Sequence, residues 1–383
     1  MIDISKKALA LHKKNKGKIA TLVTTPIKNK LDLSLAYTPG VAEVSRAIAK
    51  RKELVFDYTI KSHTVGIVTD GSAVLGLGNI GPEAALPVME GKAALFKTFA
   101  DLDAFPICLA TQDTEEIISI VTAIAPVFGG INLEDISAPR CFEIEARLQN
   151  LGIPVMHDDQ HGTAVVALAG LINAAKVAKR KLSSLRIVIV GAGAAGSAIA
   201  KLVSPLVSDV ISVDSRGIIY KTRPGLEVYK LNLARITNKK NLKGSMQDAL
   251  VGADVVIGVS TAGILSGKDI ALMAPRPIVF AMANPMPEIM PDEAKKAGAF
   301  IVATGRSDFS NQINNSLSFP GIFKGAMASK ATRITDEMKL AAARALANLV
   351  KKPASDKIIP GPFDRGVVNA VSSAVSKIAK RRS

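Results

Sequence analysis

The sequence is dominated by short apolar runs, each followed by an acidic or glycine-rich loop and then by a helical pattern. Runs of this kind are typical of strands that are buried on both faces of a parallel sheet. Nine segments show the pattern: TVGIVTD, AFPICLA, GGINLED, IPVMHDD, RIVIV, VISVD, DVVIGVS, PIVFAMA and AFIVAT. Because they alternate with helical patterns, we predict an α/β fold.

The nine runs fall into two groups, which predicts two domains. A long helical stretch, HGTAVVALAGLINAAKVAK, separates the first four runs from the other five. A chain of 383 residues can bury two ordinary cores. We expect one α/β domain at 1–160, whose first sixty residues form basic helices. The second domain, 161–383, is expected to contain a doubly wound parallel sheet of the Rossmann type and to end in helices.

Composition argues against several classes of protein. Apolar residues make up 48% of the chain, as in globular proteins. Polar residues, proline and glycine interrupt the longest apolar stretch, 117–131, so it is not expected to span a membrane. The lysine-rich start lacks the apolar core of a signal peptide. We therefore expect a cytoplasmic protein that does not engage a membrane. The net charge of +16 would suit nucleic acid, but the lysines are scattered and only 4% of residues are aromatic. We therefore expect a solvated basic surface that favours small anionic substrates and binds no nucleic acid.

Cys108 and Cys141 lack the paired spacing of a zinc site and are expected to be buried thiols.

A glycine motif directly after the RIVIV run predicts a dinucleotide site. It has the form GxGxxG and begins a helix, where glycines let the backbone approach a pyrophosphate and the helix N-terminus donates hydrogen bonds. Asp214 ends the next strand, where a carboxylate would accept from the adenosine ribose, which slightly favours NAD over NADP. Three nearby cations could instead hold the 2′-phosphate of NADP: Arg216, Lys221 and Arg223. The residues expected at the cofactor are Gly191, Gly193, Ala194, Ala195, Gly196, Asp214 and Asn284.

Several other loops are expected near the same site. A second GxGxxG, at 76–81, does not directly follow its strand, and we interpret it as a loop close to the substrate. Three later loops, STAG, ANPMPE and GRSDF, follow strands and should face the cofactor. Asn284 and the pair Asn314–Asn315 offer uncharged donors for a nicotinamide ribose or a carboxylate, although an isolated asparagine often only forms a turn.

Two acidic pairs, Glu134–Asp135 and Asp158–Asp159, each follow a short strand. Ligands in α/β sheets bind outside the carboxyl ends of the strands, so both pairs should line one crevice. Converging buried carboxylates are costly without a cation, and oxygen ligands favour Mg²⁺ or Mn²⁺. Since His157 and His161 flank the second pair, a metallohydrolase is an alternative. However, Asp158 stands where the HExxH motif has glutamate, and the segment reads as a strand end rather than one helix.

Two further side chains could transfer protons. Lys92 lies among apolar residues of a predicted helix, and desolvation lowers the pKa of a lysine until it can act as a base near neutral pH. A lysine whose ammonium group reaches the surface is the commoner case. Tyr37 precedes a Pro-Gly turn and is one of only four tyrosines, for which packing is the default role.

Taken together, these segments resemble the malic enzymes of the compact prokaryotic type. The resemblance covers nearly the whole chain: LSLAYTPGVAE, VTDGSAVLGLGNIGPEAALPVMEGKAALFK, DAFPICL, GGINLEDISAPRCFEIE, HDDQHGTA, GAGAAG, ANPMPEIMP, ATGRSDFSNQINN and FPGIF. It implies oxidative decarboxylation of (S)-malate to pyruvate and CO₂, with reduction of NAD or NADP and a divalent metal; oxaloacetate would also be decarboxylated. We expect a homodimer. Malolactic enzyme, which shares these motifs but releases lactate and retains its NAD, is the alternative.

The resemblance also implies roles for individual residues. The catalytic set would be Tyr37 as general acid, Lys92 as general base and Asp158 as the partner of Lys92. The metal ligands would be Glu134, Asp135 and Asp159. Malate would contact Lys92, Asn284 and Asn315, with Asn284 also near the nicotinamide. One position departs: long eukaryotic malic enzymes have an arginine for the substrate carboxylate where this chain has Ala73. Recognition would then fall to the backbone of that glycine-rich loop or to the asparagines.

Overall fold

The computed structural model describes residues 4–74 and 76–381. Two sheets form the centres of two bodies, and helix α8 (Asp158–Val177) runs between them. The α/β prediction is confirmed, since every strand expected from an apolar run is present. Among the described helices, none is both long and apolar enough to cross a membrane.

The first sheet has four parallel strands in the order β2-β1-β3-β4. Its strands are β1 (Thr64–Thr69), β2 (Asp103–Cys108), β3 (Gly130–Leu133) and β4 (Val155–His157). A helix follows each strand: α5 (Gly81–Leu95), α6 (Thr114–Ile124), α7 (Arg140–Leu148) and α8. All four strands therefore point their carboxyl ends to one edge, where the loops after β1 and β3 meet the first turn of α8.

The second sheet has six strands in the order β10-β9-β8-β5-β6-β7. Its strands are β5 (Arg186–Val190), β6 (Asp209–Asp214), β7 (Gly217–Ile218), β8 (Val255–Gly258), β9 (Ile278–Ala281) and β10 (Ile301–Thr304). Its helices are α9 (Ala194–Val203), α10 (Val228–Ile236), α11 (Met246–Leu250), α12 (Gly267–Ala271) and α13 (Pro291–Lys296). The doubly wound arrangement agrees with the prediction, but the sheet is mixed. Two residues link Asp214 to Gly217, so the chain turns back and β7 pairs antiparallel with β6.

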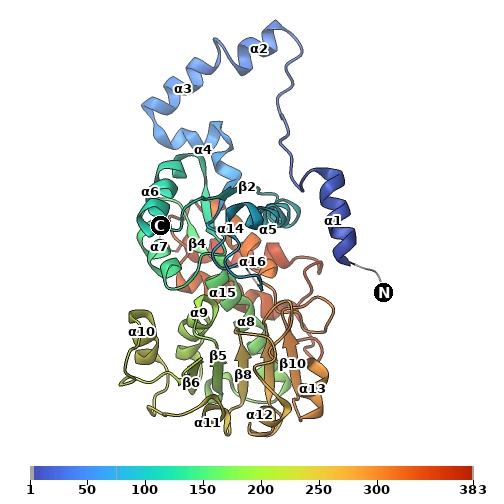
Figure 1. Cartoon of the computed structure of the whole chain (residues 1–383). Coiled ribbons are helices and arrows are strands. Elements are labelled where there is room, and N and C mark those ends of the chain that lie inside the picture. Colours follow the sequence, from blue (N-terminus) through green and yellow to red (C-terminus); the bar gives the residue numbers. More distant parts are fainter. Residues whose placement is uncertain (1–3, 75, 382–383) are drawn as a thin grey trace.

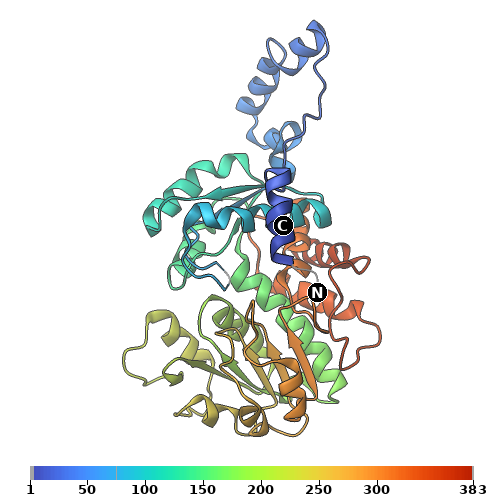
Figure 2. The same cartoon turned by 45° about the vertical axis from the view of Figure 1, so that its right-hand side comes forward.

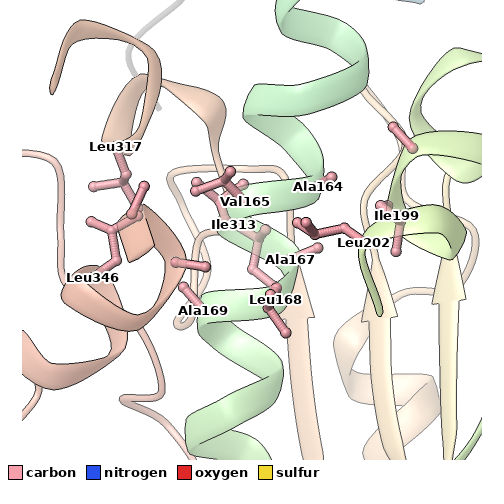
Figure 3. Close-up of a cluster of buried hydrophobic side chains, with 14 of the residues drawn as sticks. Ala164, Val165, Ala167, Leu168, Ala169, Ile199, Leu202, Ile313, Leu317 and Leu346 are labelled. Carbon is pink, nitrogen blue, oxygen red and sulfur yellow. The ribbon is translucent and has the colours of Figure 1, made fainter. Parts of the chain in front are cut away.

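Helix α8 is the centre of the largest hydrophobic core. Its side chains from Ala164 to Ala169 are buried between α9 on one side and the C-terminal segments on the other (Figure 3). Burying one leucine or valine contributes about 1.5–3 kcal/mol. Because both bodies pack on this helix, its first turn, which carries Asp158 and Asp159, lies at the junction between the two sheets.

The C-terminal helices return to the first body. They are α14 (Phe319–Ala328), α15 (Asp336–Leu349) and α16 (Val367–Ala379). Phe319 and Phe323 of α14 pack on Phe96 after α5, with ring centroids 4.7 and 5.5 Å apart. The chain after β10 is thus shared between the two bodies, and the division at residue 160, which falls inside α8, stays a prediction.

The N-terminal helices contribute no fully buried residue to either core, and of their described residues only Phe56, in the last helix, packs against the core of the first body. These helices are α1 (Ile4–Asn15), α2 (Lys30–Ala36), α3 (Val41–Lys50) and α4 (Val55–Tyr58), and none of them has a buried residue. Figures 1 and 2 show α2 and α3 standing away from the rest of the molecule. We call residues 19–50 the arm. Short helical turns complete the structure: η1 (Lys52–Leu54), η2 (Ile60–His63), η3 (Phe96–Ala100), η4 (Ala125–Val127), η5 (Leu182–Ser184), η6 (Ser204–Leu206) and η7 (Asn315–Leu317).

Candidate active site

The two acidic pairs lie together at the carboxyl edge of the first sheet. Glu134, Asp135 and Asp159 each place one carboxylate oxygen within 4.8 Å of the other two. The amide of Asp135 donates to Asp159 Oδ2 at 2.8 Å, and Asp135 has a φ of 53°, a left-handed conformation rare for residues other than glycine. Its Oδ2 is buried and has no hydrogen-bond partner among the described residues. Strain and an unsatisfied oxygen at one point indicate a ligand site.

The electrostatics of this cluster favour a cation. The pKa of Asp135 is raised to about 9, mainly by burial and further by the neighbouring carboxylates. Burial also raises the pKa of Asp159 to about 6. The pKa of Glu134 is raised in the same way. Three carboxylates that resist ionising together are stabilised when a divalent ion binds, and an all-oxygen set suits Mg²⁺ or Mn²⁺. The residues present therefore fit such an ion.

Lys92 on α5 lies in the centre of the acidic groups. Its Nζ is 2.5 Å from Asp158 Oδ2 and 2.5 Å from Glu134 Oε2, and only 6% of its side chain is exposed. Burial alone would lower the pKa of Lys92, but the charges of Asp158, Glu134 and Asp159 outweigh it and raise the pKa above its usual value. The expectation of a lowered pKa is thus wrong for this arrangement, because desolvation acts on Lys92 together with three carboxylates. Burial in turn raises the pKa of Asp158 to about 7.

A cavity of about 490 Å³ connects the acidic cluster to the second sheet. Asp159 of α8 and Ala195 of the glycine motif both line it. Asn284 lines it from the loop after β9, Asn315 from the start of η7, and Ser260 from the loop after β8. Residues predicted separately for metal, dinucleotide and substrate thus border one space.

The backbone of the glycine motif has the conformation that lets a pyrophosphate approach it closely. Gly191 has a φ of 110°, and a Cβ on Gly196 would lie 1.8 Å from the Gly191 carbonyl oxygen. Helix α9 begins at Ala194, so its free amides point toward the cavity end of β5. Asp214 ends the neighbouring strand β6, as predicted, but its carboxylate is already paired with Arg223 and Lys230.

The second glycine motif lies where a substrate loop was expected. Gly76 lines the cavity and has a φ of 73°. A Cβ there would lie 2.5 Å from the carbonyl oxygen of Asn284. The loop after β1 therefore touches the loop after β9, and only glycine allows that contact. Position 75, between the motif and Ala73, lies outside the described residues.

Tyr37 is not brought to this cavity by its own chain. It caps the end of α2 on the arm, and 65% of its surface is exposed. The arm stands away from both sheets (Figures 1 and 2). The candidate site of one chain thus contains Lys92 and the carboxylates without the tyrosine.

The histidines do not form a metal site with the carboxylates. The acidic group found among the described residues includes neither of them. His157 is fully buried, 3.6 Å from Asp159 Oδ2, and desolvation lowers its pKa to about 4. His161 pairs with Glu145 at 2.9 Å. This disfavours the metallohydrolase alternative. Cys141 is buried as expected, whereas Cys108 is partly exposed.

Sequence reasoning missed two glutamates that hold the site in shape, the partly buried Glu145 and the fully buried Glu288. Glu145 of α7 accepts hydrogen bonds from the His157 amide and from Gln160 and pairs with His161, fixing the first turn of α8. Glu288 accepts from the amides of Ser260 and Ala283, both of which line the cavity. A glutamate in a helix or loop reads as a surface residue, so the sequence contains no signal for either role.

Fold and site together define a two-body α/β protein in which an acidic cluster that fits a divalent ion faces a Rossmann-type sheet. Residues 16–149 match the family described as "Malic enzyme, N-terminal domain", and residues 160–380 match "Malic enzyme, NAD binding domain". The chain belongs to the malic enzyme family. It is 54% identical to the bifunctional malic/malolactic enzyme of Bacillus subtilis, across 99% of this chain and 93% of that protein. It is 45% identical to the NADP-dependent malic enzyme of Halomonas elongata, across 95% and 90%. The crystal structure of the NAD-dependent malic enzyme from Thermotoga maritima superimposes with a TM-score of 0.93, at 51% identity, across 96% of this chain and 98% of that one.

Proposed function

We propose that this protein oxidatively decarboxylates (S)-malate to pyruvate and CO₂ while reducing NAD or NADP. The observation that supports this most is the single cavity lined by both Asp159 of the acidic cluster and Ala195 of the glycine motif. A cation site facing a dinucleotide site is what oxidation of a 2-hydroxy acid followed by loss of CO₂ requires. The names of the relatives, which include NAD- and NADP-dependent malic enzymes, point the same way.

In this proposal the divalent ion is held by Glu134, Asp135 and Asp159. When bound there, it supplies Lewis-acid polarisation of substrate oxygens and a positive charge that offsets the carboxylates. The unsatisfied Oδ2 of Asp135 and the left-handed backbone of that residue support the assignment. Asn284 and Asn315 would donate uncharged hydrogen bonds to malate, in the absence of an arginine at position 73.

Proton transfer in oxidation falls to Lys92. A cation at the carboxylates would offset the negative charges that raise the pKa of Lys92, so that its Nζ could be neutral before reaction. The neutral Nζ would then accept the proton of the C2 hydroxyl while the C2 hydride passes to the nicotinamide, and Asp158 would hold the resulting ammonium through the 2.5 Å contact. After CO₂ leaves, Tyr37 would give its phenolic proton to C3 and regain a proton from the Lys92 ammonium. The product is then pyruvate.

Because the arm holds Tyr37 away from its own cavity, we propose that the protein is a homodimer in which each arm reaches the site of the partner subunit. Several large apolar side chains of the arm are exposed together, which is unusual for a surface that contacts only water. Their exposed fractions are Leu22 87%, Val23 77%, Leu31 67%, Leu35 66% and Tyr37 65%. A second copy of the chain would bury them. It would also bring a phenol to a site that lacks one.

The test is the appearance of reduced nicotinamide absorbance when malate, Mn²⁺ and NAD or NADP are added to the purified protein. We expect equimolar pyruvate. We also expect slower decarboxylation of added oxaloacetate. Formation of lactate without net cofactor reduction would favour malolactic enzyme, the alternative that is kept because the Bacillus subtilis relative is named for both activities. The absence of both products would contradict the proposal.

A further inference from the structure

The dinucleotide half of the site contains a charge arrangement that the glycine motif alone does not predict. Asp214 ends β6 beside the motif, and the amide of Gly191 donates to the carbonyl of Val213 at 2.9 Å. In folds of this kind, the acid at this position accepts from the adenosine ribose hydroxyls. A free carboxylate there repels the 2′-phosphate that distinguishes NADP from NAD.

The carboxylate of Asp214 is not free. Its Oδ1 accepts from the Arg216 amide and from Arg223 Nη1, both at 2.9 Å. Its Oδ2 is paired with Arg223 Nη2 and lies 3.2 Å from Lys230 Nζ. Only 8% of the side chain is exposed. Asp214 is therefore largely neutralised before any nucleotide binds.

The cations around Asp214 outnumber the acids. Arg223 is fixed in turn by the carbonyls of Gly217 and Ile218, both at 3.1 Å. Lys230 has a second acidic partner, Glu227, at 2.9 Å. With Arg216 included, three cations face two carboxylates, so the group carries a net positive charge.

Arg216 is the cation best placed to meet a ligand. It follows Asp214 by two residues, in the exposed turn between β6 and β7. Among the described residues, its guanidinium contacts the carbonyls of Pro224 and Gly225 and no carboxylate. It therefore keeps its full charge beside the position of the adenosine ribose.

We propose that the cluster of Asp214, Arg216, Arg223 and Lys230 makes this protein bind NAD and NADP with similar affinity. Arg216 would contact the 2′-phosphate, and Arg223 and Lys230 are positioning residues that keep Asp214 from repelling it. The inference rests on the proposed function, because it assumes that a dinucleotide occupies the glycine motif.

Binding of NAD and NADP to the purified protein, measured by calorimetry without malate, tests this. We expect the two dissociation constants of the unaltered protein to lie within about tenfold of each other, with NAD the tighter. Arg216→Ala should weaken NADP by about tenfold and change NAD by less than about threefold. Lys230→Met, which returns charge to Asp214, should also weaken NADP selectively. Arg235→Ala removes the same charge from an exposed site on α10, where the side chain contacts only Asn232 among the described residues, and should change neither constant.

Two results would overturn the inference. One is NADP binding more than about a hundredfold weaker than NAD in the unaltered protein. The other is an equal change of both constants in Arg216→Ala. Failure of both nucleotides to bind would remove this inference and the proposed function together. If both nucleotides bind as expected and the substitutions weaken only NADP, but malate is not oxidised, the inference is supported and only the proposed function is contradicted.

Discussion

Mixed dimers offer a sharp test of the shared site. If Tyr37 acts in the cavity of the partner subunit, a dimer of one Tyr37→Phe chain and one Lys92→Ala chain contains one site with both residues intact. Its other site lacks both. Each homodimer should be at least about 10²-fold slower, since general acid or base catalysis is lost at both of its sites. The mixed dimer should regain about half the turnover of the unaltered dimer, because one site of two is complete.

The assay uses two affinity tags and tandem purification after co-expression, followed by malate-dependent reduction of NAD. A matched control pairs an unaltered chain with a Tyr37→Phe/Lys92→Ala chain. In the shared arrangement, each site of that dimer lacks one residue, so its activity should fall to the level of the homodimers. If each site used its own tyrosine, the outcomes would be reversed: no activity in the first dimer and about half in the control. That reversal, or a chain that stays monomeric, would refute the reasoning.

Three further substitutions test the site. Asp159→Ala should abolish Mn²⁺-dependent turnover. The dissociation constant for NAD, measured by calorimetry, should change by less than about threefold, because the acidic cluster and the glycine motif belong to different sheets. Unchanged Mn²⁺ dependence would make the cluster structural. Lys92→Ala should slow malate oxidation by about 10²–10⁴-fold, whereas a near-normal rate would place the base elsewhere. Glu145→Ala leaves the buried His157 amide unpaired and should lower the free energy of unfolding in urea by about 1–3 kcal/mol. It should also weaken Mn²⁺ binding, and a change in neither would remove the positioning role.

Much of the fold follows from local patterns in the sequence. Strands that are buried on both faces must be continuous apolar runs, so β1 and β5 were visible as TVGIVT and RIVIV. Parallel strands end at one edge, which is why the acidic pairs after β3 and β4 could be expected to meet. Strand β7 was missed because two residues, Gly217 and Ile218, form it, too few to show an alternation.

The properties of individual site residues were harder to predict. The direction of the Lys92 pKa depends on carboxylates that come from β3 and α8, and burial alone suggested the opposite sign. The sequence correctly predicted that Asp214 ends a strand. Its pairing with Lys230, sixteen positions along the chain, depends instead on how α10 packs. Neither contact leaves a periodic signal in the sequence.

The sequence by itself determined which segments become strands and helices, where the glycine motif lies and which acidic pairs end strands, because these depend on neighbours within a few residues. Only the tertiary structure decided which charges face one another. It placed Lys92 among three carboxylates, neutralised Asp214 and held Tyr37 on an arm outside its own cavity. Charge interactions depend on distance and burial in three dimensions, and those are set by packing between elements far apart in the chain.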